Sequence, residues 1–294
     1  MQLLNASGCL DALTAPEVAR SLDAFVTKTI TPLPREGNPP VRIAETDVGM
    51  LNTIGLANPG RERFVADVLP RLRTLGVPIW VSVGGFTAAE YAETCAVLAG
   101  VAAIELNLSC PNVDEAPESA AEIVSACRAA TALPLYAKLS PALPDVAAVA
   151  VAVQEAGADG LSLVNTIRGL KLDPRTLRPV LSRGAGGLSG PALKPIALAA
   201  VYACYRATRM PIVGMGGVAS GGDALDLIAA GALGVALGTI LFADPAAPAR
   251  VRAELEAELA LRGLADTVQA RGIAQGDRDP NTKKPLHLAQ KRPG

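Results

Sequence analysis

One stretch of the chain, Ile104-Glu-Leu-Asn-Leu-Ser-Cys-Pro-Asn112, gathers several side chains that can do chemistry. Its first half is an apolar run with a β-branched start, which is typical of a buried strand. Its second half presents an amide, a hydroxyl, a thiol and a second amide where the strand must stop, because Pro111 cannot donate to a ladder. In parallel α/β proteins this end of a strand is where ligands bind. A thiol in an apolar segment is usually structural, but the flanking asparagines and the stop at Pro111 favour Cys110 as the reactive group.

Two lysines interrupt otherwise apolar runs, Lys28 within residues 25–30 and Lys138 within residues 135–139. A lysine that points into a barrel is costly unless it meets an anion. The alternative is a lysine that extends to the rim. With the two lysines, a further set of polar side chains predicts a site for a flat, polar, anionic molecule: Asn52, Asn107, Asn112, Asn165 and Thr166.

Glycines end the last two apolar runs, as Gly214-Met-Gly-Gly217 and Gly238-Thr239. Glycine lets backbone N–H groups approach an anion, and the helix expected after Gly217 adds its positive end. Glycine also simply makes tight turns, so this signal is of moderate strength. A phosphate site here would suit a sugar-phosphate isomerase as well as an enzyme that binds flavin mononucleotide (FMN).

Composition excludes several classes of function. The 294 residues are half hydrophobic, with a formal net charge of -1 and 3% aromatic residues, which argues for one large domain and against a nucleic-acid surface. The single histidine, His287, lies in the tail, so a Ser-His-Asp triad or a His-ligated metal is not expected. Five scattered cysteines without a Cys-x-x-Cys pair fit reduced thiols in a cytoplasmic protein, with no metal or iron–sulfur cage. No apolar segment is long enough for a bilayer, so no membrane association is expected.

The elements that must position these residues alternate between short apolar runs and helical patterns, about eight times. Thr87 to Glu90 reads as a capping box, and Ser220 and Gly231 would begin and end a later helix. Near-continuous apolar strands suit a parallel sheet covered by helices. The pattern predicts a TIM (β/α)8 barrel, with a doubly wound open sheet as the alternative. The expected strands are 3–7, 25–31, 78–83, 103–109, 135–140, 160–166, 211–216 and 234–239.

Two connections, 32–60 and 167–190, are longer than simple βα loops and follow strands, so we expect long loop insertions on the carboxyl-end face. Residues 49–56 are too apolar for free solvent. After about Asp266 the chain is basic and rich in Gly and Pro, without periodicity. We therefore predict a catalytic barrel over 1–265 and a disordered basic tail over 266–294.

Together these motifs resemble class 1 dihydroorotate dehydrogenases, and the sequence around residues 186–195 and 214–218 is most similar to the class 1B catalytic subunit. The similarity runs in order from Ala6 to about Phe242. It rests on these motifs: Ala6-Ser-Gly-Cys9, Thr27-Lys-Thr29, Gly37-Asn-Pro39, Gly49-Met-Leu-Asn-Thr-Ile-Gly-Leu56, Asn107-Leu-Ser-Cys-Pro-Asn112, Lys138-Leu-Ser-Pro141, Val164-Asn-Thr166, Gly186-Gly-Leu-Ser-Gly-Pro191, Gly214-Met-Gly-Gly217 and Leu237-Gly-Thr239.

The resemblance implies an FMN-dependent oxidoreductase of pyrimidine biosynthesis. It implies that Cys110 takes a proton from C5 of dihydroorotate while hydride leaves C6 for N5 of FMN. The positions implied for the substrate are Lys28, Asn52, Thr53, Ile54, Gly55, Leu56, Asn107, Asn112, Asn165 and Thr166. Those implied for FMN are Ser7, Lys28, Thr29, Ser82, Asn107, Lys138, Val164, Gly190, Gly216, Gly217, Gly238 and Thr239.

The resemblance also implies a homodimer, and for class 1B a partner subunit that carries FAD and an iron–sulfur cluster and passes electrons to NAD. A class 1A enzyme would use fumarate instead. Two departures stand out: the strand at residues 3–7 begins almost at Met1, without the family's preceding hairpin, and the loop after Asn112 is short. They motivate two alternatives, an FMN-dependent dehydrogenase of another dihydropyrimidine and a weakened homologue that acts as an assembly partner. A phosphosugar lyase would need acid–base residues that the sequence lacks. Cys9, Cys95, Cys127 and Cys204 are expected only to pack.

Overall fold

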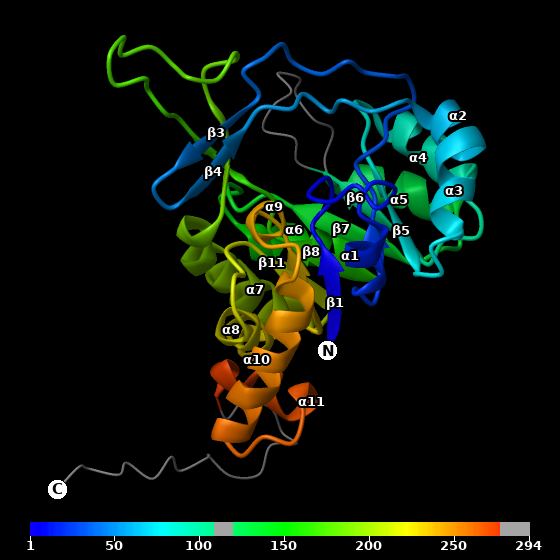
Figure 1. The fold of residues 1–294 in the computed structure, drawn as a ribbon. Helices are drawn as coiled ribbons and strands as arrows, with labels where there is room; N and C mark the ends of the chain where they lie inside the picture. The colour runs from blue at the N-terminus through cyan, green and yellow to red at the C-terminus, as the bar shows by residue number, and fades with distance from the viewer. Residues whose placement is uncertain (109–119, 277–294) are drawn as a thin grey trace, which may run out of the picture.

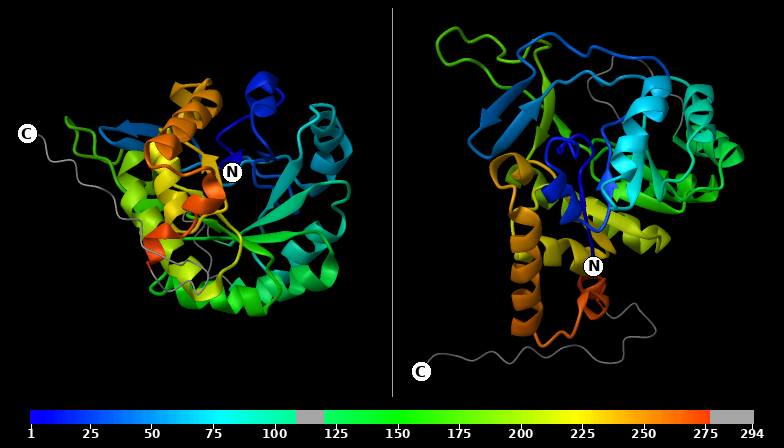
Figure 2. Two further views of the ribbon diagram at one scale, coloured as in Figure 1. Left: turned by 90° about the horizontal axis from the view of Figure 1, so that it is seen from below. Right: turned by 45° about the vertical axis from the view of Figure 1, so that its right-hand side comes forward.

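The computed structural model describes residues 1–108 and 120–276. Eight parallel strands follow the order β1-β12-β11-β8-β7-β6-β5-β2 and form a nearly closed barrel with helices outside it (Figures 1 and 2). Each strand coincides with an expected run, apart from β1, which begins one residue earlier than expected, so the TIM barrel prediction is confirmed. The strands are β1 (Gln2–Asn5), β2 (Phe25–Val26), β5 (Ile79–Val83), β6 (Ala103–Asn107), β7 (Leu135–Leu139), β8 (Gly160–Leu163), β11 (Ile212–Met215) and β12 (Gly234–Leu237).

The barrel closes between β1 and β2 through a side chain. The Asn5 amide nitrogen donates to the carbonyl oxygen of Val26 at 2.8 Å, and the Val26 N–H donates to the Asn5 side-chain oxygen at 2.8 Å. Asn5 is fully buried. The amide side chain of Asn5 thus adds two hydrogen bonds to the backbone bond from the Asp23 N–H to the Leu3 carbonyl at 2.9 Å, and together they join the two-residue β2 to β1.

Two helices begin at the capping residues that the sequence predicts. Thr87 accepts from the Glu90 N–H at the start of α4 (Ala88–Ala96), and Ser220 with Asp223 forms a capping box before α8 (Gly221–Ala230), which ends at Gly231. These predicted caps are confirmed. The other helical segments are α1 (Pro16–Arg20), α2 (Arg61–Arg63), η1 (Phe64–Val68), α3 (Leu69–Arg73), α5 (Ala120–Ala130), α6 (Val146–Glu155), η2 (Pro191–Leu193), α7 (Lys194–Thr208), α9 (Ile240–Ala243), α10 (Ala247–Leu261), α11 (Thr267–Ala270) and η3 (Ile273–Gln275).

Two apolar layers hold the barrel. The larger lies between strands and helices, and the smaller fills the barrel's amino-terminal half, where the Trp80 and Tyr136 rings lie 4.3 Å apart. Alternation along β6 separates the layers: Ile104 and Leu106 pack outward, whereas Ala103 joins the inner layer. Because side chains fill the amino-terminal half of the barrel, a ligand can enter the barrel only at its carboxyl end.

The two long connections form a second sheet rather than loops alone. The strands β3 (Ile43–Thr46), β4 (Gly49–Asn52), β10 (Gly186–Ser189) and β9 (Ile167–Gly169) pair antiparallel in the order β3-β4-β10-β9. β3 and β4 lie beyond one end of the barrel in Figure 1. The apolar segment 49–56 is explained, since Leu51 packs with Ala44 and Leu181 beneath this sheet.

The folded chain continues beyond residue 265, where we expected the tail to begin. Asp266 caps α11, whose Ala270 is buried, and the Gln275 amide donates to the carbonyls of Tyr202 and Ala230. The helix is only four residues long, so its sequence carries no periodicity that would reveal it. The rest of the predicted tail, 277–294, and the site segment 109–119 lie outside the described residues.

Candidate active site

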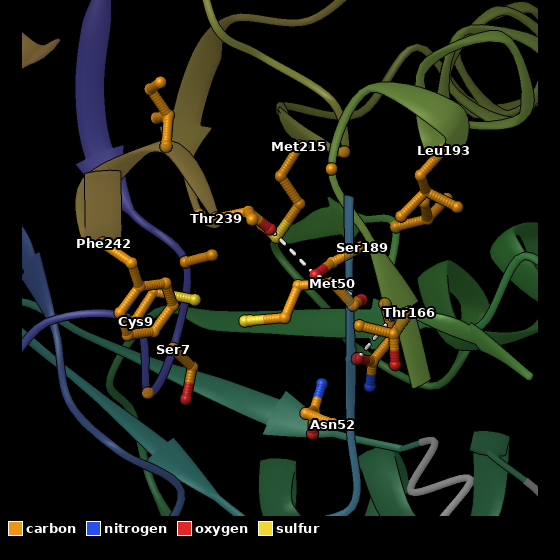
Figure 3. A pocket seen from close by; sticks show the side chains of 18 of the residues that line it. Ser7, Cys9, Met50, Asn52, Thr166, Ser189, Leu193, Met215, Thr239 and Phe242 are labelled. Carbon is orange, nitrogen blue, oxygen red and sulfur yellow. Dashed lines mark hydrogen bonds between the residues drawn. The ribbon is translucent and has the colours of Figure 1, made fainter. Parts of the chain in front are cut away.

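A cavity of about 390 Å³ opens at the carboxyl end of the barrel, next to the antiparallel sheet. Its wall comes from the ends of the barrel strands and from β4 and β10. In Figure 3 the labelled side chains Met50 and Asn52 of β4 face Ser7 and Cys9, which follow β1. The second sheet is therefore one wall of the site.

Most of the predicted site residues meet in this cavity. They are Ser7, Lys28, Thr29, Asn52, Ile54, Gly55, Leu56, Asn107, Lys138, Val164, Asn165, Thr166, Gly190, Gly216, Gly217, Gly238 and Thr239. Thr53 and Ser82 do not line it. Both are buried: the Thr53 hydroxyl accepts from the Asn38 amide at 2.9 Å, and Ser82 bonds to Thr29. Cys110 and Asn112 lie outside the described residues.

Asn107 is the centre of the polar wall. Its side-chain oxygen accepts from the Asn165 amide at 3.1 Å, and its side-chain nitrogen donates to Thr29 Oγ1 at 3.3 Å. The Tyr91 hydroxyl, from α4, donates to the Asn107 backbone carbonyl at 2.6 Å. Because the donor and the acceptor of the Asn107 side chain are both hydrogen-bonded within the protein, the orientation of this amide is fixed. A site that binds a ligand through hydrogen bonds to ring amides requires such a fixed orientation.

A chain of hydroxyls supports the same wall from below. Ser7 donates to the Thr27 carbonyl at 2.8 Å and lies 3.3 Å from Thr29 Oγ1, which in turn lies 2.9 Å from Ser82 Oγ. Ser82 thus supports the site through Thr29 and does not face the cavity.

The cavity is positively charged on its floor and side. Lys138 extends from β7 and is 6% exposed, and Lys28 follows β2. The Lys138 ammonium forms an ion pair of 3.4 Å with the carboxylate of Glu105, which is 1% exposed. Lysines that line a cavity suit an anionic ligand.

Cys9 also lines the cavity, although we expected it only to pack. Burial raises the pKa of the Cys9 thiol, while the positive charges of Lys138 and Lys28 oppose that shift. The net effect keeps the thiol protonated at neutral pH. Cys95, Cys127 and Cys204 are buried outside the cavity, so for them the expectation is confirmed.

Glycines line the cavity where β11 and β12 end. Gly217 has a positive φ of 75°, and a Cβ there would lie 2.7 Å from the Lys194 Cβ and 3.0 Å from the Gly190 carbonyl oxygen. Gly190 itself approaches the backbone of Gly49, where a Cβ would lie at 2.6 Å. Gly238 has ordinary room for a Cβ, so the fold alone does not require glycine there. Packing within the protein thus requires glycine at positions 190 and 217. Gly190, Gly217 and Gly238 all line the cavity, the last two at the strand ends where TIM barrels bind phosphate.

Several cavity residues escaped the sequence analysis. They are Met50, Ser189, Leu193, Met215 and Phe242, all labelled in Figure 3. Thr239 Oγ1 donates to Ser189 Oγ at 2.8 Å, which ties the last barrel strand to β10. Met50 and Ser189 belong to strands hidden in long connections. The apolar character of residues 49–56 is a signal that could have found Met50, and Ser189 lies within the glycine-rich segment 186–190.

Over residues 1–108 and 120–276, no group of three or more His, Cys, Asp or Glu side chains gathers as a metal site. Within the same ranges no helix has the length and hydropathy needed to cross a bilayer.

A TIM barrel with lysines, ordered amides and a glycine cradle in one carboxyl-end cavity belongs to the class of barrel enzymes that bind a phosphorylated ligand beside a small polar substrate. The chain belongs to the dihydroorotate dehydrogenase family, whose model matches residues 2–259.

Three relatives are named dihydroorotate dehydrogenase B (NAD(+)), catalytic subunit. The protein from Desulforudis audaxviator is 46% identical over 263 residues, covering 86% of each chain. That from Latilactobacillus sakei is 44% identical over 281 residues, covering 90% of this chain and 91% of its own. That from Geobacillus kaustophilus is 43% identical over 272 residues, covering 87% and 86%. The crystal structure of DHODH from Eimeria tenella in complex with ferulenol superposes with a TM-score of 0.80 at 24% identity, over 94% of this chain and 86% of that one, and supports the fold.

Proposed function

We propose that this chain is the catalytic subunit of a dihydroorotate dehydrogenase of de novo pyrimidine biosynthesis, with FMN as its cofactor. The observation that carries the proposal is the meeting, in one cavity, of two lysines, an ordered wall of amides and a glycine cradle. The family match and the names of the relatives support it.

In this proposal the cavity divides between cofactor and substrate. FMN, when bound, accepts the hydride from C6 of dihydroorotate. The backbone N–H groups at Gly216 and Gly217 would hold its phosphate, and Lys138 would supply a positive charge to its ring. Lys28 would bind the substrate carboxylate, and the amides of Asn52, Asn107 and Asn165 would bind the ring.

Cys110 removes the C5 proton in this proposal, so that loss of a proton from C5 and of a hydride from C6 creates the C5=C6 bond of orotate. Cys110 and Asn112 lie outside the described residues; in the sequence they follow Asn107, the last residue of β6, by three and five positions. A thiol that must lose its own proton first makes the rate rise with pH.

The proposal extends to the electron acceptor. The relatives' names specify NAD(+) and a catalytic subunit. The words catalytic subunit support a second, partner subunit, and from the family resemblance we infer that this partner holds FAD and an iron–sulfur cluster and that the chain itself forms a homodimer. With NAD as acceptor, turnover then requires that partner, and fumarate does not replace it.

A panel of substrates tests the assignment against a different dihydropyrimidine. Reduction of the bound flavin by dihydroorotate, and not by dihydrouracil, is expected, because only dihydroorotate carries the carboxylate for Lys28. Reduction by dihydrouracil alone would overturn the choice of substrate. Reduction by neither would favour the weakened homologue.

A further inference from the structure

A carboxylate with no role in the proposed reaction lies directly below the cavity. Glu105 belongs to β6, two residues before Asn107, and is 1% exposed. Ala103, two residues earlier, packs in the apolar layer with Trp80. Glu105 therefore occupies the level between the filled half of the barrel and the ligand cavity.

Its partner is Lys138, at 3.4 Å, on the neighbouring strand β7. The two side chains are 1% and 7% exposed. Removing two charges from water costs more than a well-packed apolar pair would, so a need for stability alone does not explain them. Lys138 lines the cavity and Glu105 does not. The lysine is thus shared between the carboxylate and the ligand site, and the carboxylate acts on the ligand only through the lysine.

The neighbouring side chains that face the same level of the barrel are neutral, so Glu105 is the group that most affects the charge of Lys138. Ser82 pairs in register with Glu105, and Ser162 pairs in register with Lys138, and both are neutral. Among residues 1–108 and 120–276, the buried Ser162 hydroxyl has no hydrogen-bond partner. Within the same part of the chain, the other titratable groups near the pair are Lys28, Cys9 and Tyr136; burial raises the pKa of both the Cys9 thiol and the Tyr136 hydroxyl, which keeps them neutral.

We propose that Glu105 is a positioning residue that holds the Lys138 ammonium on the cavity floor and offsets its charge, and thereby lowers the reduction potential of the bound flavin. This inference rests on the proposed function. A cation near the flavin favours the anionic reduced form, and a carboxylate paired with that cation weakens the effect. By keeping the reduction potential of the flavin low, Glu105 would favour transfer of electrons from the reduced flavin to the next acceptor.

The test is the reduction potential of FMN in the loaded protein, measured against a reference dye, for Glu105→Gln. The amide keeps the shape and removes the charge. At a fixed potential the ratio of reduced to oxidised flavin should rise about tenfold, which is about 30 mV for a two-electron couple. Glu105→Asp keeps the charge and should stay closer to the unmodified protein than Glu105→Gln does. Ser162→Ala is the matched control, because it changes the same buried level without changing charge.

A double-mutant cycle shows whether Glu105 acts through Lys138. In a Lys138→Met background, Glu105→Gln should leave the potential unchanged. An unchanged potential for Glu105→Gln alone, or an equal shift with and without Lys138, would overturn the inference while leaving the flavoenzyme assignment intact. Failure of the unmodified chain to bind FMN would instead overturn the proposed function. If Glu105→Gln does not fold, a potential for Glu105→Asp equal to that of Lys138→Met would also contradict the inference.

Discussion

The side-chain amide of Asn165 donates to the side-chain oxygen of Asn107 at 3.1 Å, although Asn165 follows β8 and Asn107 is the last residue of β6. The strand between them, β7, carries Lys138. The Asn165 side-chain oxygen in turn accepts from the Thr166 N–H at 2.9 Å. Each amide thus fixes the other, and the wall that faces the substrate is assembled before the substrate arrives.

Because the two amides orient each other, removing both should cost less than the sum of removing each. We expect Asn107→Ala and Asn165→Ala each to weaken orotate binding about tenfold or more. The double variant should fall short of the product of the two effects. Orotate titrations of the flavin spectrum measure all three. Strictly multiplicative losses would show that the two amides act independently.

Lys28 should discriminate between ligands by their carboxylate. Lys28→Ala should weaken orotate binding by about 1.5–3 kcal/mol, the contribution of a charge-assisted hydrogen bond. Binding of uracil, which lacks the carboxylate, should change little. The same titration with both ligands checks this, and an equal loss for both would mean that Lys28 supports the fold of the site rather than the carboxylate.

Two glycines of the cradle allow a matched comparison. Gly217→Ala forces a side chain onto a φ of 75° and against Lys194, so it should destabilise the protein by about 1–3 kcal/mol. Gly238→Ala meets nothing closer than 3.5 Å, so stability should persist while FMN affinity falls. Thermal unfolding and flavin titration separate the two effects. Full FMN affinity in Gly238→Ala would remove this strand end from the phosphate site.

The thiols of Cys9 and Cys110 should differ in how they affect the dependence of the reaction rate on pH. Burial raises the pKa of Cys9, so this thiol stays protonated where the reaction runs. A free thiol ionises near pH ~8.5, and the rate of flavin reduction should therefore rise into the alkaline range through Cys110. Cys110→Ala should slow the reduction and remove the rise, whereas Cys9→Ala should retain the rise. If Cys9→Ala lost the rise, Cys9 would be the base and the assignment to Cys110 would be wrong.

The capping carboxylate of α8 should make stability depend on pH. Burial alone would raise the pKa of Asp223, but hydrogen bonds from Lys194, the Ala219 N–H and Ser220 hold that pKa below 3.8. The stabilisation is therefore present above the unfolded value and is lost as the pH falls through the folded pKa.

Asp223→Ala should accordingly cost about 1–2 kcal/mol at pH 7, and the cost should shrink in acid. Asp226 also contacts Lys194, at 2.8 Å, but its side chain is 53% exposed and lies outside the cap. Asp226→Ala is the control and should cost less than about 0.5 kcal/mol. Denaturant titrations at pH 7 and pH 3 measure both, and a cost for Asp223→Ala that does not vary with pH would contradict this account.

The sequence predicted the barrel because its strands are short apolar runs between amphipathic helices, a local signal that survives without tertiary context. The same holds for the caps at Thr87 and Ser220. The antiparallel sheet could not be predicted, since β4 and β10 pair across more than 130 residues and neither is long enough to be periodic by itself. Met50 and Ser189 were missed with it. Glu105 was read as part of a buried strand, because only its register with Ser82 and its contact with Lys138 reveal that it faces inward.

The measurement that tests the central claim most directly is an anaerobic absorption spectrum of the purified chain before and after dihydroorotate is added. The account predicts a yellow protein whose flavin band near ~450 nm bleaches, and much slower bleaching in Cys110→Ala. A yellow protein that dihydroorotate leaves unchanged would contradict the substrate assignment. A colourless protein that also fails to take up added FMN would contradict the assignment as a flavoenzyme.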